Sequence, residues 1–220
     1  MRRFYRFSEH RGLKVLEIGF GQGTDLVQFA EGGAICYGVD ITQKHFELAT
    51  KNFKLRGLKA DLILNDANNL PYEDDTFDVV YSFGVLHHTP DTNRCISEAF
   101  GVLKPGGELI ISLYHSRSAF HIISVYLVNG ILRRKIKSIG YDGLLSLIEE
   151  GADGVKIKPL VKLYSAATLK IMLNDFSSTS IFVRHLEKSH FSLFGKFIPS
   201  FIVKLLENKM GWYVIGRAIK

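Results

Sequence analysis

Near the start of the chain, an apolar run leads into three alternate glycines: Lys14-Val15-Leu16-Glu17-Ile18-Gly19-Phe20-Gly21-Gln22-Gly23-Thr24. The run is typical of a buried strand, and the glycines allow a tight turn with close approach of the backbone to a ligand. A helix over residues 24–30 is predicted next, because Gly32 and Gly33 stop it. A strand, a glycine turn and a helix in this order open a doubly wound α/β fold.

The rest of the first half continues to alternate strands with helices. Strands are predicted at residues 34–40, 60–65, 77–82 and 108–114. A helix is predicted from Thr42 to Gly57, and another begins at Thr89-Pro90, with Thr89 as N-cap, and ends at residues 104–107. Strands separated by helices predict right-handed βαβ units and a parallel sheet covered on both faces.

The second half has weaker patterns. Helices are predicted over residues 119–138, 141–150, 165–176 and from about 200 to 210, and strands over 180–186 and 212–218. No linker separates the halves, so we expect one domain over residues 1–220. Its cofactor-binding half is 1–115, and residues 116–220 form an acceptor-binding or lid half that completes the sheet.

Composition excludes several classes of protein. The chain has 220 residues, 46% of them hydrophobic, which suits one packed domain and not a disordered chain. Cys36 and Cys95 lie among apolar residues, so a disulfide scaffold is not expected and a reducing cytoplasm is favoured. Histidine and cysteine do not cluster at zinc-ligand spacing, and we expect no metal. Neither a signal peptide nor a membrane span is predicted.

The net charge of +6 is distributed unevenly. Residues 1–115 carry 12 basic and 15 acidic residues, whereas residues 116–220 carry 16 basic and 7 acidic ones. The basic half therefore suits an acidic partner or a membrane surface, although lysines on solvated helix faces explain it equally well.

Acidic residues stand at three successive strand ends. Glu17 precedes the glycine turn, Asp40 ends the second predicted strand and Asp66 follows the third. Ligands of open α/β sheets bind at these carboxyl ends, and an aspartate after the second strand meets ribose hydroxyls. A dinucleotide fingerprint needs glycine at the sixth position of the turn, where this chain has Thr24. A carboxylate at Glu17 suits a cationic ligand such as S-adenosylmethionine. Each aspartate taken alone is also a common cap or turn residue.

Five ordered motifs extend the pattern: Val15-Leu16-Glu17-Ile18-Gly19-Phe20-Gly21-Gln22-Gly23, Gly38-Val39-Asp40-Ile41, Asp66-Ala67 with Leu70-Pro71-Tyr72 and Phe77-Asp78-Val79-Val80, Val85-Leu86-His87-His88, and Val102-Leu103-Lys104-Pro105-Gly106-Gly107. Over about residues 13–115 the chain resembles the class I S-adenosylmethionine-dependent methyltransferases, and within them the small-molecule (type 11-like) subgroup. The resemblance implies a Rossmann-like sheet of seven strands, mostly parallel, with the last one antiparallel and helices on both faces.

The resemblance also implies the cofactor and the residues that hold it. Glu17, Gly19, Gly21 and Gly23 would contact the methionine part of S-adenosylmethionine. By the same resemblance, further parts of the site are Asp40 and Ile41 at the ribose, Asp66 and Ala67 at the adenine, and Ser82 and Phe83 at the methyl-bearing end. Only about 13 residues precede the first strand, where the family usually has one or two covering helices. Arg2, Arg3 or Arg6 could reach the methionine carboxylate.

Histidines provide the candidates for a general base. His87 and His88 follow the fourth strand beside the expected methyl position, and Tyr114 and His115 end the fifth. A histidine that caps the turn or packs against a helix is the competing interpretation. The sequence Ser82-Phe83-Gly84-Val85 differs from the Asp/Asn-Pro-Pro-aromatic motif of amino-methylating nucleic-acid enzymes. No specific nucleic-acid partner is therefore expected.

Three functions remain open from the sequence. The first is a methyltransferase that acts on oxygen or nitrogen of a small, acidic or amphiphilic molecule. The second is a non-catalytic module that binds S-adenosylmethionine. The third is a nicotinamide-dependent oxidoreductase, which Thr24 and Glu17 disfavour. The apolar, basic stretches at residues 120–137 and 191–209 fit packing helices, a lid, or a helix that lies on a membrane surface.

Overall fold

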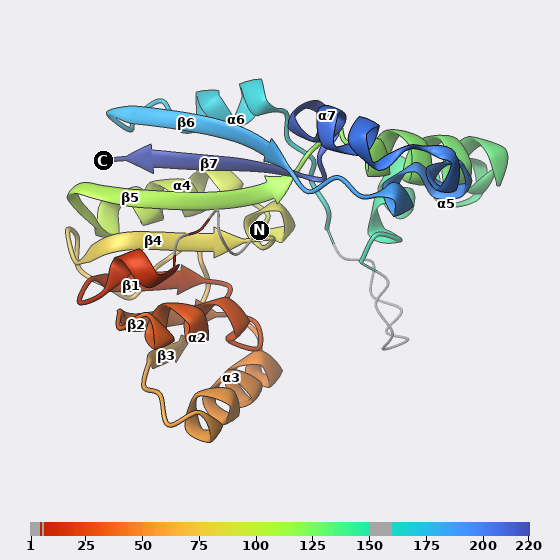
Figure 1. Ribbon diagram of the computed structural model, residues 1–220. Coiled ribbons are helices and arrows are strands. Elements are labelled where there is room, and N and C mark those ends of the chain that lie inside the picture. Colours follow the sequence, from red (N-terminus) through yellow and green to blue (C-terminus); the bar gives the residue numbers. More distant parts are fainter. Residues whose placement is uncertain (1–4, 6, 150–159) are drawn as a thin grey trace.

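A single seven-stranded sheet organises the computed structural model, which describes residues 5, 7–149 and 160–220 (Figure 1). The strand order is β3-β2-β1-β4-β5-β7-β6. β1 to β5 are parallel where they pair, and β7 runs antiparallel to both β5 and β6. The bounds are β1 (Lys14–Ile18), β2 (Ile35–Asp40), β3 (Asp61–Leu64), β4 (Phe77–Phe83), β5 (Leu103–Tyr114), β6 (Ser178–Arg184) and β7 (Tyr213–Ile219). The predicted doubly wound sheet with an antiparallel last strand is confirmed.

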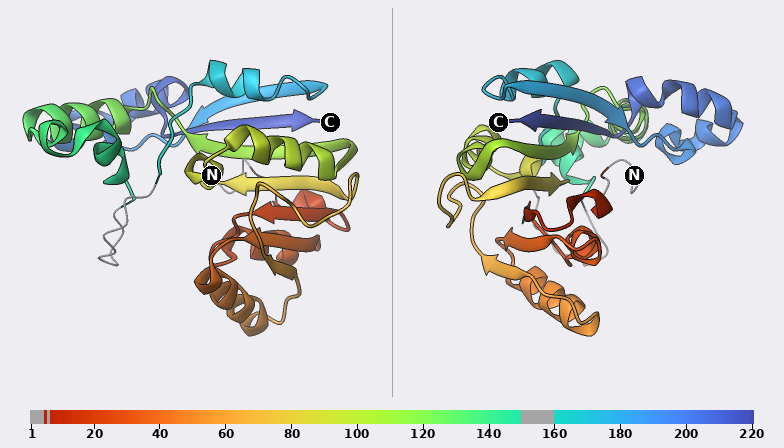
Figure 2. Two further views of the ribbon diagram at one scale, coloured as in Figure 1. Left: turned by 180° about the vertical axis from the view of Figure 1, so that it is seen from behind. Right: turned by 60° about the vertical axis from the view of Figure 1, so that its left-hand side comes forward.

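Helices cover both faces of this sheet, and the central strands β1 and β4 are accordingly buried along almost their whole length (Figures 1 and 2). One face carries the short 3₁₀ helix η1 (Phe7–His10), α2 (Thr24–Glu31) and α3 (Gln43–Leu55). The opposite face carries α4 (Thr92–Val102) and α6 (Ala166–Met172). Side chains of successive strand residues point to opposite faces, so each strand contributes side chains to the core on either side of the sheet.

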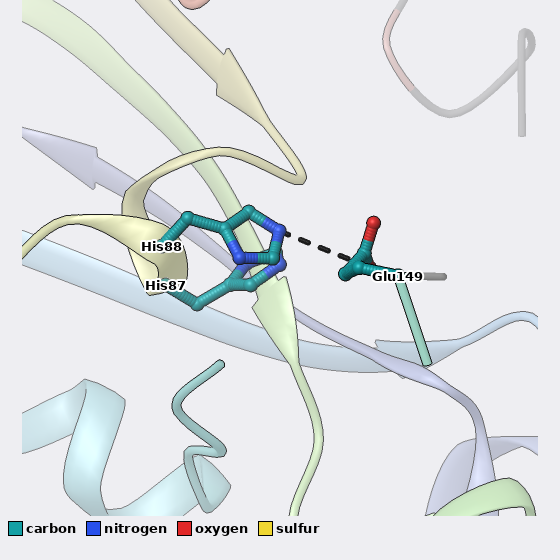
Figure 3. Close-up of side chains that lie close together, drawn as sticks. All are labelled: His87, His88 and Glu149. Atoms are coloured by element: carbon teal, nitrogen blue, oxygen red, sulfur yellow. Dashed lines mark ion pairs between the residues drawn. The ribbon is translucent and has the colours of Figure 1, made fainter. Parts of the chain in front are cut away.

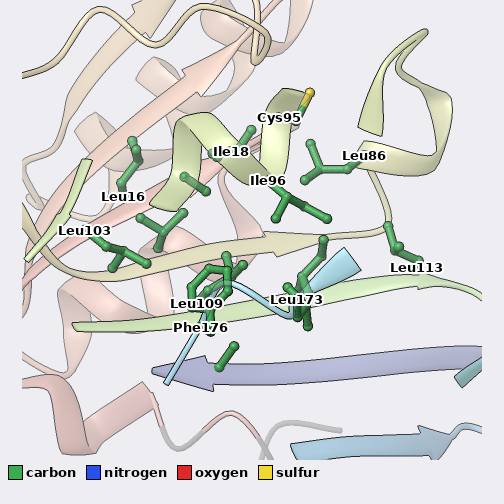
Figure 4. Packing of buried hydrophobic residues seen from close by; sticks show 14 of the residues in the cluster. Leu16, Ile18, Leu86, Cys95, Ile96, Leu103, Leu109, Leu113, Leu173 and Phe176 are labelled. Atoms are coloured by element: carbon green, nitrogen blue, oxygen red, sulfur yellow. The ribbon is translucent and has the colours of Figure 1, made fainter. Parts of the chain in front are cut away.

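The core under α4 and α6 joins the two halves of the chain (Figure 4). Leu16 and Ile18 of β1 belong to the same buried cluster as Leu173, next to α6, and Val214 of β7. Because β7 also lies between β5 and β6, the second half supplies both strands and packing to the sheet.

The entrance to α4 differs from the prediction. Asp91, not Thr89, is the N-cap, and its Oδ1 accepts a hydrogen bond from the Arg94 N–H at 3.0 Å. The Thr89 hydroxyl instead donates to the Leu86 carbonyl at 2.8 Å, next to the 3₁₀ turn η2 (Leu86–His88). At the other end, α4 gives way directly to β5, which starts at Leu103 rather than at residue 108.

The helix predicted over residues 119–138 is also divided. A π-helical segment, η3 (Phe120–Leu132), ends before Arg134, whose φ of 57° is left-handed. A new helix, α5 (Lys135–Ser146), follows and is itself broken at Gly140. The apolar and the basic parts of this stretch therefore belong to different elements.

Two further elements complete the second half: the 3₁₀ segment η4 (Lys188–Phe197) and α7 (Ser200–Met210), which begins where the sequence predicts a helix. Together with η3 and α5 they extend beyond the carboxyl ends of β4 and β5 (Figure 1). Among the described residues, no helix combines the length and the apolar character needed to cross a bilayer.

Candidate functional site

A cavity of about 510 Å³ lies at the carboxyl ends of four neighbouring strands. Its lining includes Ile18 at the end of β1, Asp40 at the end of β2, Asp66 just after β3 and Gly84 just after β4. β1 is flanked by β2 and β4, so the strand order reverses here. This is the edge at which open α/β sheets bind ligands.

The three glycines of the first turn have three different surroundings. Gly19, Gly21 and Gly23 all have positive φ angles, of 77°, 53° and 74°. A Cβ on Gly21 would meet nothing within 4 Å, so this residue leaves the cavity open. A Cβ on Gly19 would overlap the γ-carbons of Val85, and one on Gly23 would press against Ala49 of α3. Gly19 and Gly21 line the cavity, whereas Gly23 packs the turn against α3.

Asp40 ties the glycine turn to the end of β2. Its carboxylate accepts hydrogen bonds from the Gly21 N–H at 2.9 Å and the Thr42 N–H at 2.8 Å. The His45 Nδ1 lies 3.2 Å from both carboxylate oxygens, which it contacts from α3. The residue is only 6% exposed yet lines the cavity, so its charge is held at the edge of the open space.

Glu17 is a buried carboxyl on the α2 side of β1, near Asp25 and Leu26, and it does not line the cavity. Its Oε2 has no hydrogen-bond partner within the described part of the chain. Burial raises the pKa of the Glu17 carboxyl well above its ordinary value, and the charges of Asp25 and Asp40 raise it further. Uncompensated burial of a carboxylate is costly, so a cation near this oxygen would relieve the strain on the site.

The far side of the cavity contains Asp66, Ala67 and Ile41. The Asp66 Oδ1 accepts hydrogen bonds from the backbone N–H and the side-chain amide of Asn68, both at 2.9 Å. Ile41 is 69% exposed directly after β2, an unusual exposure for an isoleucine that faces a concave site. An apolar surface beside a carboxylate suits a flat, partly polar ring such as adenine.

Ser82 and Phe83 do not line the cavity in this arrangement. The Ser82 hydroxyl is buried and donates to the Ile18 carbonyl at 2.9 Å, which fixes the ends of β4 and β1 to each other. The Phe83 ring turns to the α2 face of the sheet, where it packs 4.7 Å from the ring of Tyr213. Gly84 and Val85, the next two residues, reach the cavity instead.

The paired histidines occupy different environments (Figure 3). His87 is fully buried, its ring lies 3.7 Å from that of Tyr114, and neither ring nitrogen has a partner among the described residues. Burial lowers the His87 pKa well below its ordinary value, so its imidazole stays neutral. His88 lines the cavity, and its Nδ1–H donates to the Leu160 carbonyl at 2.7 Å. That bond leaves the Nε2 lone pair of His88 on the side of Glu149, whose Oε1 is 3.8 Å away.

Glu149 completes this part of the lining. The residue follows α5, and its Oε1 accepts a hydrogen bond from the Tyr114 hydroxyl. Burial and this carboxylate raise the pKa of Tyr114 above its ordinary value, so the phenol remains a donor. His115 lies elsewhere: it is 3% exposed, does not line the cavity and donates from Nδ1 to the Gly211 carbonyl at 3.1 Å.

The structure thus brings together at one cavity seven of the residues singled out from the sequence: Gly19, Gly21, Asp40, Ile41, Asp66, Ala67 and His88. Arg2, Arg3 and Arg6 lie outside the described residues. Two lining residues with ionisable side chains, His45 and Glu149, are not indicated by the sequence analysis. His45 stands in the first turn of the helix after Asp40, a position from which it reaches back to that carboxylate. Glu149 belongs to no motif, and no sequence signal indicates it.

Comparisons with known proteins agree with this geometry. Residues 16–111 match a family model described as a methyltransferase domain. Methyltransferase GfsG of Streptomyces halstedii is 31% identical over 130 residues, which cover 58% of this chain and 47% of that protein. The 27-O-demethylrifamycin SV methyltransferase of Amycolatopsis mediterranei is 36% identical over 107 residues, covering 46% of this chain and 38% of its own length. The chain thus matches less than half the length of either relative.

Solved structures share the fold across nearly all of the chain. The cyclase SpnF aligns with a TM-score of 0.64 at 20% identity, over 100% of this chain and 80% of that one. A SAM-dependent methyltransferase from Aquifex aeolicus aligns with a TM-score of 0.57 at 18% identity, over 99% and 87% of the two chains. The matched segment contains Gly19, Gly21, Asp40, Asp66 and His88, which line the cavity described above. Residues 16–111 are therefore similar in sequence to the methyltransferase-domain family, and nearly the whole chain shares its fold with a solved SAM-dependent methyltransferase.

Proposed function

We propose that this protein transfers a methyl group from S-adenosylmethionine to oxygen or nitrogen of a small, acidic or amphiphilic molecule. The observation that carries the proposal is the single cavity that gathers Gly19, Gly21, Asp40, Asp66 and His88 at adjacent strand ends. The names of relatives leave the acceptor atom open, since they include a 27-O-demethylrifamycin methyltransferase and a phosphoethanolamine N-methyltransferase.

The residues present fit the cofactor that the family implies. The open space at Gly21 admits the chain of a ligand close to the backbone, whereas Glu17, whose Oε2 has no partner among the described residues, is buried outside the cavity lining. In this proposal Asp40 accepts from ribose hydroxyls, and Asp66 and the Ala67 N–H contact adenine; the support is that all three residues line the cavity. When bound, the cofactor supplies an electrophilic methyl group on a sulfonium.

The chain's own task is then to orient an acceptor and to remove its proton. Correct orientation alone can be worth about 7–11 kcal/mol of the barrier. His88 is our candidate for the base, because its Nδ1–H is engaged by Leu160 and its Nε2 faces the cavity side. The Glu149 carboxylate lies beside this nitrogen, with its Oε1 3.8 Å from the His88 Nε2. His87 is buried and neutral, which suits a packing role that positions His88.

Calorimetry tests the cofactor directly. We expect the protein to bind S-adenosylmethionine and its demethylated product, and NAD to show no binding. Asp40→Ala should weaken cofactor binding by roughly 2–3 kcal/mol, since it removes a charged acceptor and releases the Gly21 turn. The matched control is Asp61→Ala, an exposed aspartate at the opposite end of β3. Unchanged affinity in Asp40→Ala, or binding of NAD alone, would overturn the assignment.

A turnover screen tests the reaction. With a labelled methyl donor and a set of small alcohols, phenols, amines and phosphorylated molecules, we expect transfer by the wild-type chain. His88→Ala should lower kcat by about 10²-fold or more while cofactor affinity is unchanged. His88→Gln keeps a side-chain donor for the Leu160 carbonyl and separates this bond from proton removal. Cofactor binding without any methyl transfer would favour the non-catalytic module. Normal turnover in both His87→Ala and His88→Ala would show that neither histidine is the general base.

A further inference from the structure

Large apolar side chains are exposed in succession along η4 and α7. Within residues 193–205, five of them have between 53% and 75% of their surface exposed: Leu193, Phe194, Phe197, Phe201 and Leu205. A protein surface rarely offers so many bulky apolar groups together unless they contact something. We call these five residues, with the lysines beside them, the basic-apolar face.

Helix α7 carries apolar side chains on both its inward and its outward side, unlike an ordinary surface helix. Val203 is buried against the cluster that includes Phe191 of η4, and this contact anchors the helix to the molecule. Phe201 and Leu205 are one helical turn apart on the opposite side, and Lys204 and Lys209 flank them. The outward face is therefore apolar at its centre and cationic at its margins.

The charges on this segment have one sign. Residues 188–210 contain four lysines (Lys188, Lys196, Lys204 and Lys209) and one acidic residue, Glu207. The Glu207 carboxylate is engaged inward, where its Oε1 accepts from the His185 N–H at 3.0 Å. On η4, the Lys196 ammonium lies 5.0 Å from the centre of the Phe197 ring, so cation and apolar surface adjoin. An anionic surface with an apolar interior complements both properties.

We propose that the basic-apolar face binds the surface of a membrane that contains anionic phospholipids. Phe197, Phe201 and Leu205 enter the boundary between headgroups and acyl chains, and the lysines contact lipid phosphates, as interfacial helices do. A symmetric contact with a second copy would set like-charged lysines against one another, which disfavours that occupant. Because η4 and α7 extend beyond the carboxyl ends of β4 and β5, this contact places lipid at the same edge of the sheet as the cavity (Figure 1).

Co-sedimentation of the full chain with vesicles tests the proposal without reference to methyl transfer. We compare vesicles of phosphatidylcholine with vesicles of phosphatidylcholine and phosphatidylglycerol, at low and high salt. Binding to the anionic vesicles is expected, and it should weaken with salt. Phe201→Ser/Leu205→Ser should reduce this binding about tenfold or more, because both apolar groups leave the interface. Lys204→Gln/Lys209→Gln should reduce it about fivefold per lysine at low salt.

The matched control removes two equally exposed apolar side chains elsewhere. Leu55 of α3 and Ile171 of α6 are 77% and 71% exposed, and Leu55→Ser/Ile171→Ser should bind vesicles as the wild type does. Circular dichroism verifies that each variant is folded, and light scattering gives its mass. The proposal is overturned if anionic vesicles do not bind the wild type, or if the control loses binding as Phe201→Ser/Leu205→Ser does. It is equally overturned if the wild type is a dimer that Phe201→Ser/Leu205→Ser dissociates, with no vesicle binding by either.

Discussion

The buried carboxyl of Glu17 makes the stability of the folded protein depend on pH. Its carboxyl is buried with an unpartnered Oε2 and a raised pKa, so the folded protein holds the Glu17 proton more tightly than the unfolded chain does. The stability that comes from this proton is complete below the ordinary pKa of glutamate. It is lost as pH rises through the raised value, at about 1.4 kcal/mol per pH unit.

Glu17→Gln should abolish this loss. Across about pH 5–8, urea unfolding should show the wild type losing stability relative to Glu17→Gln as pH rises. Saturating cofactor should reduce the difference in unfolding free energy between the wild type and Glu17→Gln, because the cofactor's ammonium favours the charged carboxylate. A difference in unfolding free energy that stays constant with pH would show that Glu17 is not protonated in the folded state.

At the scale of elements, two factors restrict the residues that the β1–α2 turn accepts: the positive φ angles of its glycines and the room around each glycine for a side chain. Gly19→Ala should be the more destabilising change, because its positive φ costs about 1–2 kcal/mol and the added methyl overlaps Val85, which costs about 1–3 kcal/mol more. Gly21→Ala should show the cost of φ alone, yet it should weaken cofactor binding because its methyl enters the cavity. Urea unfolding and calorimetry measure the two effects separately.

Gly12→Ala provides the control for this comparison. Gly12 has a φ of 77° and nothing within 4 Å of an added Cβ, and it lies outside the cavity lining. The Gly12→Ala variant should lose as much unfolding free energy as Gly21→Ala does, whereas its cofactor affinity should be unchanged. If Gly12→Ala and Gly21→Ala reduced cofactor affinity equally, the turn would not be part of the binding site.

Elements with strong local sequence signals could be predicted, and those without such signals could not. β1 and its glycine turn combine an apolar run with residues that permit positive φ, and both signals are local. The α4 cap was misplaced because Thr89 and Asp91 are both good N-caps, and only the structure shows the Thr89 hydroxyl committed to Leu86. The break at Arg134 has no glycine or proline to mark it.

For the whole molecule, the contacts between the halves lie beyond local sequence patterns. Glu149 reaches the cavity through packing of the second half, and Glu108 of β5 forms a two-pronged ion pair with Arg217 of β7, at 2.6 and 2.7 Å. The buried cluster that contains Ile18 and Val214 spans the same boundary. We therefore propose that residues 1–220 unfold as one cooperative domain.

Two probes on opposite halves test this cooperativity. Trp212 is the sole tryptophan of the chain and lies buried 4.3 Å from the Tyr114 ring, so its fluorescence reports the second half. Hydrogen exchange of the β1 and β2 amides reports the first. In urea, both probes should give one midpoint, because loss of β7 removes pairing from β5 and packing from β1 together. Glu108→Gln should lower that midpoint for both probes alike, since it leaves Arg217 without its charged partner. Separate midpoints, or a shift confined to Trp212, would mean that the cofactor-binding half folds independently of the strands that complete its sheet.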